Sequence, residues 1–434
     1  MSGPAAHDAA PERLDRFMAR ANAAYYARCD PFADFVTAPE ITQAFGEILG
    51  AWAVVMWQAM GAPDPVLLVE AGPGRGTLMA DALRLVARVA PAFGRALQLH
   101  LVEISPRLRA IQAQALAGAS SAPITWHDRV EDLPAGPFIL LANEFLDALP
   151  VRQLVRTTEG WAERHVLDGG FVLRPGVPPP APLDRRVAMP GEVLEWCEPA
   201  LAIVRWLARR LAGSPGVALF LDYGPDQPGV GDTLQALRNG RPAPPLSDPG
   251  EADLTAHVDF PALRDAAAAA GAIVHGPDGQ GAVLTALGLF PRTERLARGR
   301  PPEQARALLD AAHRLAAPER MGRLSRSCCA TRRSACRRGS APGEQHERDR
   351  RRHDHRASGA PRQRGPVAPA AWLFHTHRRR VGRAVHQPEL QRHQRRHAGR
   401  AAREPAAGGR GGGRLPRPAA RRDAGAWHDR RDRG

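Results

Sequence analysis

Residues 66–78 read VLLVEAGPGRGTL, and this stretch decides the fold class. An apolar run ends at Glu70, and glycines follow at three alternate positions, Gly72, Gly74 and Gly76. Glycine is favoured where the backbone takes a positive φ or passes close to a ligand. Such a turn also brings the free N–H groups of the next helix to the same place. The stretch therefore predicts a strand, a ligand-binding turn and a helix, in that order.

Further apolar runs alternate with helical segments along the chain. Strands are expected in LQLHLVEIS (97–105), FILLANEF (138–145) and VALFLDYG (217–224), with helices between them. Strands that alternate with helices are typical of a mostly parallel sheet covered on both faces. We therefore predict an α/β fold of the Rossmann-like type. A helix that begins after Thr37 and runs to about residue 60 precedes the sheet.

Composition divides the chain into five expected segments. The Pro-rich and Gly-rich stretch near its middle interrupts the alternation, and the character changes again after residue 324. The expected segments are N-terminal helices and a loop (1–60), the ligand-binding core (61–150), an insertion over the mouth of the sheet (151–215), the second half of the core (216–324) and an Arg-rich tail (325–434).

The positive charge lies in the tail. The formal charge of the chain is +15, but residues 325–434 hold 29 Arg against 9 acidic residues, which leaves 31 basic and 36 acidic residues before them. The tail has too few apolar residues to form a core, so we expect it to be disordered. It also lacks the interleaved aromatics of a nucleic-acid-binding region. An Arg-rich nucleic-acid-binding protein is thus a rival interpretation that we do not favour, and no nucleic-acid partner is expected.

Cysteine usage and hydropathy bear on metals and location. The five cysteines form no CxxC pair, so neither a disulfide framework nor a metal site is indicated. The N-terminus has no apolar core of the signal-peptide kind. The most apolar long segment, residues 44–60, is short for a membrane span and contains Glu47. These features predict no metal, no membrane insertion and a cytoplasmic location, and they leave the oligomeric state open.

Three acidic residues suggest which ligand the glycine turn binds. Glu70 precedes the first glycine, and the third glycine comes one residue earlier than in the dinucleotide pattern GxGxxG. Glu103, at the end of the second strand, could accept hydrogen bonds from two ribose hydroxyls. Asp128, after an expected third strand, could read an adenine amino group. The set favours S-adenosylmethionine, with an NAD(P)-dependent oxidoreductase as the alternative.

Eight blocks of the sequence, taken together, resemble a known family. They cover about residues 13–324 and are DFVTAPEITQAFGEILGAW, VEAGPGRGTLMADALR, HLVEISPRLRAIQ, NEFLDALPVRQ, LFLDYG, TLQALR, ADLTAHVDF and GQGAVLTALGL. In this order they resemble the bacterial and mitochondrial class I S-adenosylmethionine-dependent methyltransferases whose mitochondrial members are arginine methyltransferases needed for assembly of respiratory complex I.

The resemblance implies a seven-stranded sheet and methyl transfer to a protein arginine, with a complex I subunit as one candidate substrate. It places the three glycines, Glu103 and Asp128 at the cofactor. The loop that closes over the cofactor would hold Thr37, Pro39 and Glu40, and the methyl-transfer site would hold Asn143 and Glu144. One departure is DPFADF (30–35), which lacks glycines that the family has there, so this loop is shortened.

Arginine is a difficult nucleophile, because its guanidinium stays protonated at neutral pH. Carboxylates are therefore needed to hold it. Glu144 and Asp147 stand three residues apart just after an apolar strand, at the sheet edge where α/β proteins bind ligands. Our hypothesis is that Glu144 orients the guanidinium and Asp147 assists, the alternative being that Asp147 caps a helix. Asp222 and Tyr223, at the end of another strand, are further candidates for the substrate cleft. A non-catalytic assembly factor with this fold is the remaining alternative.

The family continues into a last strand where this chain reads SRSCCATRRSACRRG (325–339). A GC-rich coding sequence for these residues, read in a neighbouring frame, can spell FKVLLRDTPLGVPAG, which has the pattern of that strand. Read likewise, residues 372–390 look like the opening of a laccase-domain polyphenol oxidase. We therefore expect residues after 324 to be a frameshift product. The last strand would then be missing, and unpaired backbone inside the sheet would destabilise the chain.

Overall fold

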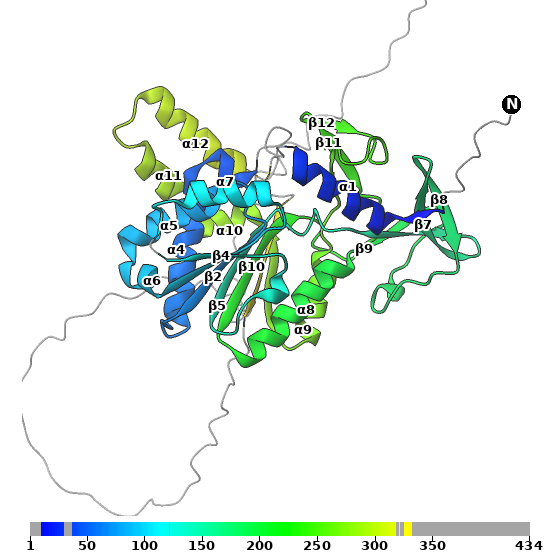
Figure 1. The fold of residues 1–434 in the computed structure, drawn as a ribbon, viewed down its shortest axis with the longest axis horizontal. Coiled ribbons are helices and arrows are strands. Elements are labelled where there is room, and N and C mark those ends of the chain that lie inside the picture. The colour runs from blue at the N-terminus through cyan, green and yellow to red at the C-terminus, as the bar shows by residue number, and fades with distance from the viewer. Residues whose placement is uncertain (1–9, 30–36, 121, 318–320, 322–324, 332–434) are drawn as a thin grey trace, which may run out of the picture. The chain divides into compact units, whose positions relative to one another are not determined.

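A seven-stranded sheet forms the centre of the structure (Figure 1). The computed structural model describes residues 10–29, 37–120, 122–317, 321 and 325–331. The strand order is β14-β15-β10-β5-β2-β3-β4, and within this sheet β15 alone runs antiparallel to its neighbours. The strands are β2 (Val66–Ala71), β3 (Leu97–Val102), β4 (Ile124–His127), β5 (Phe138–Asn143), β10 (Gly216–Tyr223), β14 (Ile273–Gly279) and β15 (Ser325–Thr331). The α/β fold with a mostly parallel sheet is as predicted.

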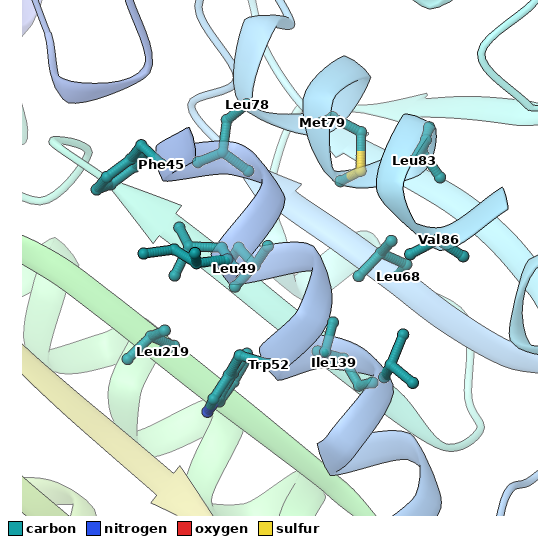
Figure 2. Close-up of a cluster of buried hydrophobic side chains, with 14 of the residues drawn as sticks. Phe45, Leu49, Trp52, Leu68, Leu78, Met79, Leu83, Val86, Ile139 and Leu219 are labelled. Atoms are coloured by element: carbon teal, nitrogen blue, oxygen red, sulfur yellow. The ribbon is translucent and has the colours of Figure 1, made fainter. Parts of the chain in front are cut away.

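Helices cover both faces of this sheet, and side chains alternate between the two layers. Leu68 and Ile139 point into the layer beside α4 and α5, as Figure 2 shows, whereas Leu67 and Leu140 pack on the opposite side. All residues of β2 and β5 are buried, as expected for strands covered on both faces. The first layer contains α4 (Gln43–Ala59), α5 (Thr77–Val89), α6 (Pro91–Ala96), α7 (Pro106–Leu116), α10 (Gln280–Ala286), α11 (Leu289–Ala297) and α12 (Pro302–Ala316); the second contains α8 (Glu198–Gly213) and α9 (Phe260–Ala269).

The structure also contains two smaller sheets, which lie beside the main sheet (Figure 1). The five-stranded sheet is formed by β1 (Glu12–Arg13), β6 (Arg152–Thr157), β7 (Gly160–Leu167), β8 (Gly170–Pro175) and β9 (Val193–Trp196). The three-stranded sheet is formed by β11 (Gln235–Arg238), β12 (Arg241–Ala243) and β13 (Asp253–Thr255). Helix α1 (Leu14–Arg28) buries Leu14 and Met18 in an apolar cluster with residues of both sheets.

The expected insertion differs in extent from the observed packing. Its strands, β6 to β9, belong to the five-stranded sheet, but α8 buries Ile203, Val204 and Leu207 in the main core. The part of the chain that packs outside the main core therefore ends near Cys197 and not at residue 215. The helix that was expected to begin after Thr37 also starts later than predicted. Thr42 is extended and its hydroxyl accepts the Ala44 N–H, so α4 begins at Gln43.

We expected the last strand of the sheet to be missing. This expectation is wrong, because the backbone of residues 325–331 forms that strand. Residues Ser325–Thr331 form β15, which pairs with β10 on one side and β14 on the other. Backbone N–H and C=O groups can complete a sheet ladder without a particular set of side chains, which is why this segment can occupy the slot. The predicted disorder of the tail beyond residue 331, and the shortened loop at residues 30–36, lie outside the described residues. Among the helices described, none has the length and apolar character that a membrane span requires.

Candidate functional site

A cavity of about 780 Å³ opens at the carboxyl edge of the main sheet and brings most of the predicted residues together. Four predicted residues, Gly76, Asp147, Asp222 and Tyr223, are not part of its lining, which includes the other ten: Thr37, Pro39, Glu40, Glu70, Gly72, Gly74, Glu103, Asp128, Asn143 and Glu144. Those residues come from five separate stretches of the sequence. They meet because parallel strands end at the same edge of a sheet.

The glycine turn, residues 72–76, has the geometry that its sequence predicts. Gly72, Gly74 and Gly76 have φ values of 67°, 54° and 82°, in the left-handed region that only glycine enters readily. A Cβ on Gly72 would lie 2.9 Å from Cδ2 of Phe145, closer than atoms can approach. Gly76 does not line the cavity, but it is the residue from which α5 begins. The turn therefore accepts no side chain at Gly72.

Glu70 places an unsatisfied carboxyl oxygen at the cavity. The residue is 2% exposed, and its Oε2 atom has no hydrogen-bond partner. Burial raises the pKa of Glu70 to about 8, although the Met79 backbone N–H opposes this by donating to the carboxylate. A buried acceptor without a partner is costly, so the position suits a donor supplied by a ligand.

Glu103 is held in place by a network that sequence reasoning missed. Its Oε1 accepts the Ser105 N–H at 2.8 Å, and its Oε2 accepts from Gln112 Nε2 at 3.2 Å. The same Gln112 amide donates to the Gly74 carbonyl at 2.9 Å and accepts from the Trp126 indole at 2.8 Å. Gln112 thus ties the second strand to the glycine turn. Each Glu103 oxygen keeps a further lone pair for a ligand hydroxyl.

Asp128 lies at the outer rim of the same cavity. Its side chain is 74% exposed and pairs with Arg109, which also donates to the Glu103 carbonyl. Ile104 is 60% exposed and also lines the cavity. An exposed aliphatic side chain in such a place offers a flat apolar surface to a ring. No sequence signal singled out Ile104, because single exposed aliphatic residues are common.

Thr37, Pro39 and Glu40 enter the cavity from α3 (Ala38–Ile41), a separate turn before α4. Glu40 Oε1 accepts from the Thr77 hydroxyl at 2.5 Å, which joins this segment to the start of α5. Thr37 precedes α3, but its side chain makes no capping hydrogen bond. The predicted role of Thr37 as the cap of the long helix is therefore wrong, since Thr42 has that role.

The acidic turn, residues 143–148, follows β5 and lies beside the glycine turn, which follows the neighbouring strand β2. Glu144 has a φ of 48°, and its Oε1 accepts from Ala38 N and Asn143 Nδ2, each at 3.4 Å. Burial, with the nearby charge of Asp222 second, raises the pKa of Glu144 to about 7. The Asn143 Oδ1 atom is buried and unpartnered. Within the described chain, no Arg or His forms an ion pair with Glu144.

Asp147 is part of this turn but does not line the cavity. Burial raises its pKa well above the usual range, and the charges of Asp222 and Glu144 add to the effect. Residues 144–150 form turns, so the alternative that Asp147 caps a helix is also wrong. Asp222 and Tyr223 do not line the cavity either; Tyr223 lines a different hollow of about 510 Å³.

The wall opposite the sheet comes from segments that no motif indicated. Helix α1 contributes Asn22 and Tyr26, and the five-stranded sheet and the start of α8 contribute Arg152, Trp196 and Glu198. The guanidinium of Arg152 stacks 4.1 Å from the Trp196 ring centroid. These residues lie far from the glycine turn in sequence, and only the tertiary fold brings them to the cavity. No group of acidic, His or Cys side chains suited to a metal ion occurs among the described residues.

The geometry of the cavity agrees with the family and the relatives that the chain resembles. Residues 48–278 match the family of S-adenosyl-L-methionine-dependent methyltransferases. The chain belongs to this family. It is 34% identical over 336 residues to the mitochondrial protein arginine methyltransferase NDUFAF7 of Danio rerio, covering 69% of this chain and 77% of that protein. It is 35% identical over 348 residues to the homolog of Drosophila melanogaster, covering 72% and 78%.

A solved structure supports the same fold. A protein from Burkholderia thailandensis, bound to S-adenosyl-homocysteine, is 30% identical with a TM-score of 0.63, covering 74% of this chain and 87% of that one. This methyltransferase therefore uses S-adenosyl-L-methionine, and the NAD(P)-dependent oxidoreductase alternative is set aside.

The expected cytoplasmic location is contradicted, because the relatives in animals are named as mitochondrial proteins. The absence of a CxxC pair and of a signal-peptide core in the sequence does not separate the cytoplasm from other reducing compartments.

Proposed function

We propose that this methyltransferase holds S-adenosyl-L-methionine between the glycine turn, Glu70 and Glu103. The residues present fit that molecule. The unpartnered Glu70 Oε2 suits an ammonium group, the bare backbone at Gly72 admits close approach, and Glu103 keeps acceptor capacity for ribose hydroxyls. Asp128 and Ile104 would meet the base. When bound, the cofactor supplies a sulfonium-activated methyl group, which becomes bonded to the acceptor atom as the methyl–sulfur bond breaks.

The acceptor that we propose is a guanidinium nitrogen of an arginine in a protein. The observation that carries this is Glu144, a carboxylate at the cavity wall with no cationic partner in the described chain. A carboxylate with that environment is suited to a planar cation that donates several N–H bonds. The names of the relatives, protein arginine methyltransferases, support the same acceptor.

Glu144 has two tasks in this scheme. Its oxygens accept N–H bonds from the guanidinium and so direct one nitrogen toward the methyl group, since catalysis of such a displacement is mainly positioning. The attacking nitrogen loses one proton in the reaction, and the methylated guanidinium remains a cation. A carboxylate with a pKa of about 7 can take that proton and release it to water near neutral pH. Asn143, with its free Oδ1, is placed to accept a further guanidinium N–H.

We propose a subunit of respiratory complex I as the protein that carries this arginine, which rests on the resemblance of the sequence blocks alone. Mass spectrometry of arginine methylation in cells with and without the gene tests this. Loss of methylation at one arginine of a complex I subunit is the expected result. Methylation that is unchanged everywhere, with complex I assembly still impaired, would support the non-catalytic assembly factor instead.

Binding assays separate the cofactor from the substrate. In isothermal titration we expect S-adenosylhomocysteine to bind with micromolar affinity and NADH not to bind. No uptake of S-adenosylhomocysteine at millimolar concentration would overturn the cofactor assignment and the proposed acceptor with it.

We also propose that residues after 324 come from a shifted reading frame. In this chain β15 has the sequence SRSCCAT. A central strand is usually rich in Val, Ile and Leu, as is the segment FKVLLRD from the neighbouring reading frame. Replacing residues 325–339 by FKVLLRDTPLGVPAG should raise the melting temperature by several degrees, because each newly buried aliphatic side chain contributes about 1.5 to 3 kcal/mol. Equal melting temperatures, or an unbroken reading frame on resequencing, would count against the shift.

A further inference from the structure

The acidic turn holds Glu144 in a conformation that a glutamate rarely takes. A φ of 48° is sparsely populated for residues other than glycine and persists only where surrounding contacts impose it. The Glu144 N–H donates to the Leu221 carbonyl at 2.8 Å, which fixes the start of the turn against β10. Asn143 and Leu221 are the last pair of the parallel ladder between β5 and β10, so the turn begins directly after that pair.

Asp222 supplies the next contacts of the turn. Its Oδ2 atom accepts three consecutive backbone N–H groups, from Phe145 at 3.1 Å, Leu146 at 2.8 Å and Asp147 at 3.4 Å. Its Oδ1 accepts the Tyr223 N–H at 2.8 Å. The side chain is 2% exposed and does not line the cavity. All of these hydrogen bonds come from backbone N–H groups. The Asp222 carboxylate therefore holds this backbone in place and is not a ligand for substrate.

The far end of the turn is tied to other parts of the fold. The Asp147 carbonyl accepts the Ala256 N–H at 3.0 Å, and the Ala148 carbonyl accepts from Asn22 Nδ2 at 3.1 Å. Between these anchors and the start of the turn, Asp222 is the side chain that binds the N–H groups of three successive residues.

The turn also touches the cofactor side of the cavity. The Phe145 ring packs against Gly72, where an added Cβ would meet Cδ2 at 2.9 Å. A shift of the Phe145 backbone would therefore move the ring that abuts the glycine turn as well as the neighbouring Glu144. We propose that Asp222 is a positioning residue for methyl transfer: it sets the distance between the carboxylate that receives the guanidinium and the turn that receives the cofactor. The inference rests on the proposed function of Glu144.

Asp222→Asn in the full chain tests this. The asparagine is close in shape and neutral, so it should fold, but one of its two acceptor positions becomes an N–H₂ donor facing backbone N–H groups. We expect kcat for arginine methylation to fall about 10²-fold, since a misplacement of about 1 Å costs that much. The KM for substrate and the Kd for S-adenosylhomocysteine should change by no more than a few fold, because Asp222 touches neither.

Hydrogen exchange gives a readout that does not depend on activity. The Phe145, Leu146 and Asp147 amides should exchange at least about tenfold faster in Asp222→Asn. Asp81→Asn is the matched control, because Asp81 is a 5% exposed carboxylate on α5 that forms an ion pair with Arg84. It should leave both kcat and these amides near the parent values.

The outcomes separate the two proposals. Unchanged exchange at the three amides, or a kcat equal to that of Asp81→Asn, would overturn the positioning role alone. A parent chain that binds S-adenosylhomocysteine but methylates no arginine would overturn the proposed acceptor, while faster exchange in Asp222→Asn would still show that Asp222 holds the turn.

Discussion

The two walls of the cavity are built in different ways. The glycine turn takes its shape from its own residues, because three glycines adopt positive φ within five positions. The acidic turn takes its shape from elsewhere, through bonds to Leu221, Asp222 and Ala256. We call the glycine turn the cofactor wall and the acidic turn the acceptor wall, after the roles that we propose for them. The shape of the cofactor wall is therefore a local feature of the sequence, whereas that of the acceptor wall exists only in the folded chain. Damage to the first should appear in cofactor affinity, and damage to the second in turnover.

Glu144→Gln should separate the walls most sharply. The amide keeps the shape and one acceptor oxygen but cannot balance a guanidinium charge or take its proton. We expect arginine methylation to fall by about 10³-fold, or ~4 kcal/mol in the barrier. The Kd for S-adenosylhomocysteine should stay within a few fold in isothermal titration. Retained turnover would show that another group holds the substrate.

Gly72→Ala should damage the cofactor wall. The new Cβ meets the Phe145 ring at 2.9 Å and sits on a residue with a φ of 67°. We expect the affinity for S-adenosylhomocysteine to fall by about 10- to 100-fold, or ~1.4 to 2.7 kcal/mol. Gly118→Ala is the matched control, since Gly118 has a φ of 77° but no atom within 4 Å of an added Cβ. It should lower stability by about 1 kcal/mol and leave binding unchanged. Equal effects on binding would mean that strain, and not the contact with Phe145, matters.

The acceptor wall should also set the pH dependence of turnover. The pKa of Glu144 is raised to about 7, so the carboxylate becomes protonated as the pH falls below that value. The kcat/KM for the protein substrate should rise with pH up to about 7 and then level off, with nearly a tenfold change per unit on the acid side. In Glu144→Gln the residual rate should lack this step. A parent profile that is flat between pH 5.5 and 8 would contradict the role of the carboxylate.

The stability of the folded protein should change with pH in the direction opposite to that of turnover. Because the folded-state pKa of Glu144 lies above its ordinary value of 4.5, the folded protein retains a proton that the unfolded chain has released. The free energy of unfolding contributed by this group therefore falls as the pH rises from about 4.5 to 7. Urea unfolding should show Glu144→Gln gaining about 1 to 2 kcal/mol on the parent between pH 5 and 8, after allowance for partial exposure at the cavity. Glu303→Gln, at an exposed position on α12, should show no such gain. If the free energies of unfolding of the parent and of Glu144→Gln change with pH in parallel, the assigned pKa is contradicted.

Much of the fold could be predicted because its signals are local. The apolar runs that form most of β2, β5 and β10 are uninterrupted, and the glycine turn marks the junction between β2 and α5. The end of the insertion was harder to predict, because α8 follows β9 directly and only its contacts show that it packs on the main sheet. The start of α4 was misplaced, because both Thr37 and Thr42 have the character of a cap and only Thr42 makes the bond.

By itself, the sequence determined the order of strands and helices, the glycine turn and the acids that end the strands. These follow from side-chain hydrophobicity and from the backbone freedom of glycine, which act over a few residues. Only the tertiary structure decided that Gln112 braces Glu103, that α1 and Trp196 close the cavity, and that Asp222 holds the acidic turn instead of lining it. The Asp222 hydrogen bonds join residues 75 to 77 positions apart, and packing of the whole chain is what brings them within hydrogen-bond distance.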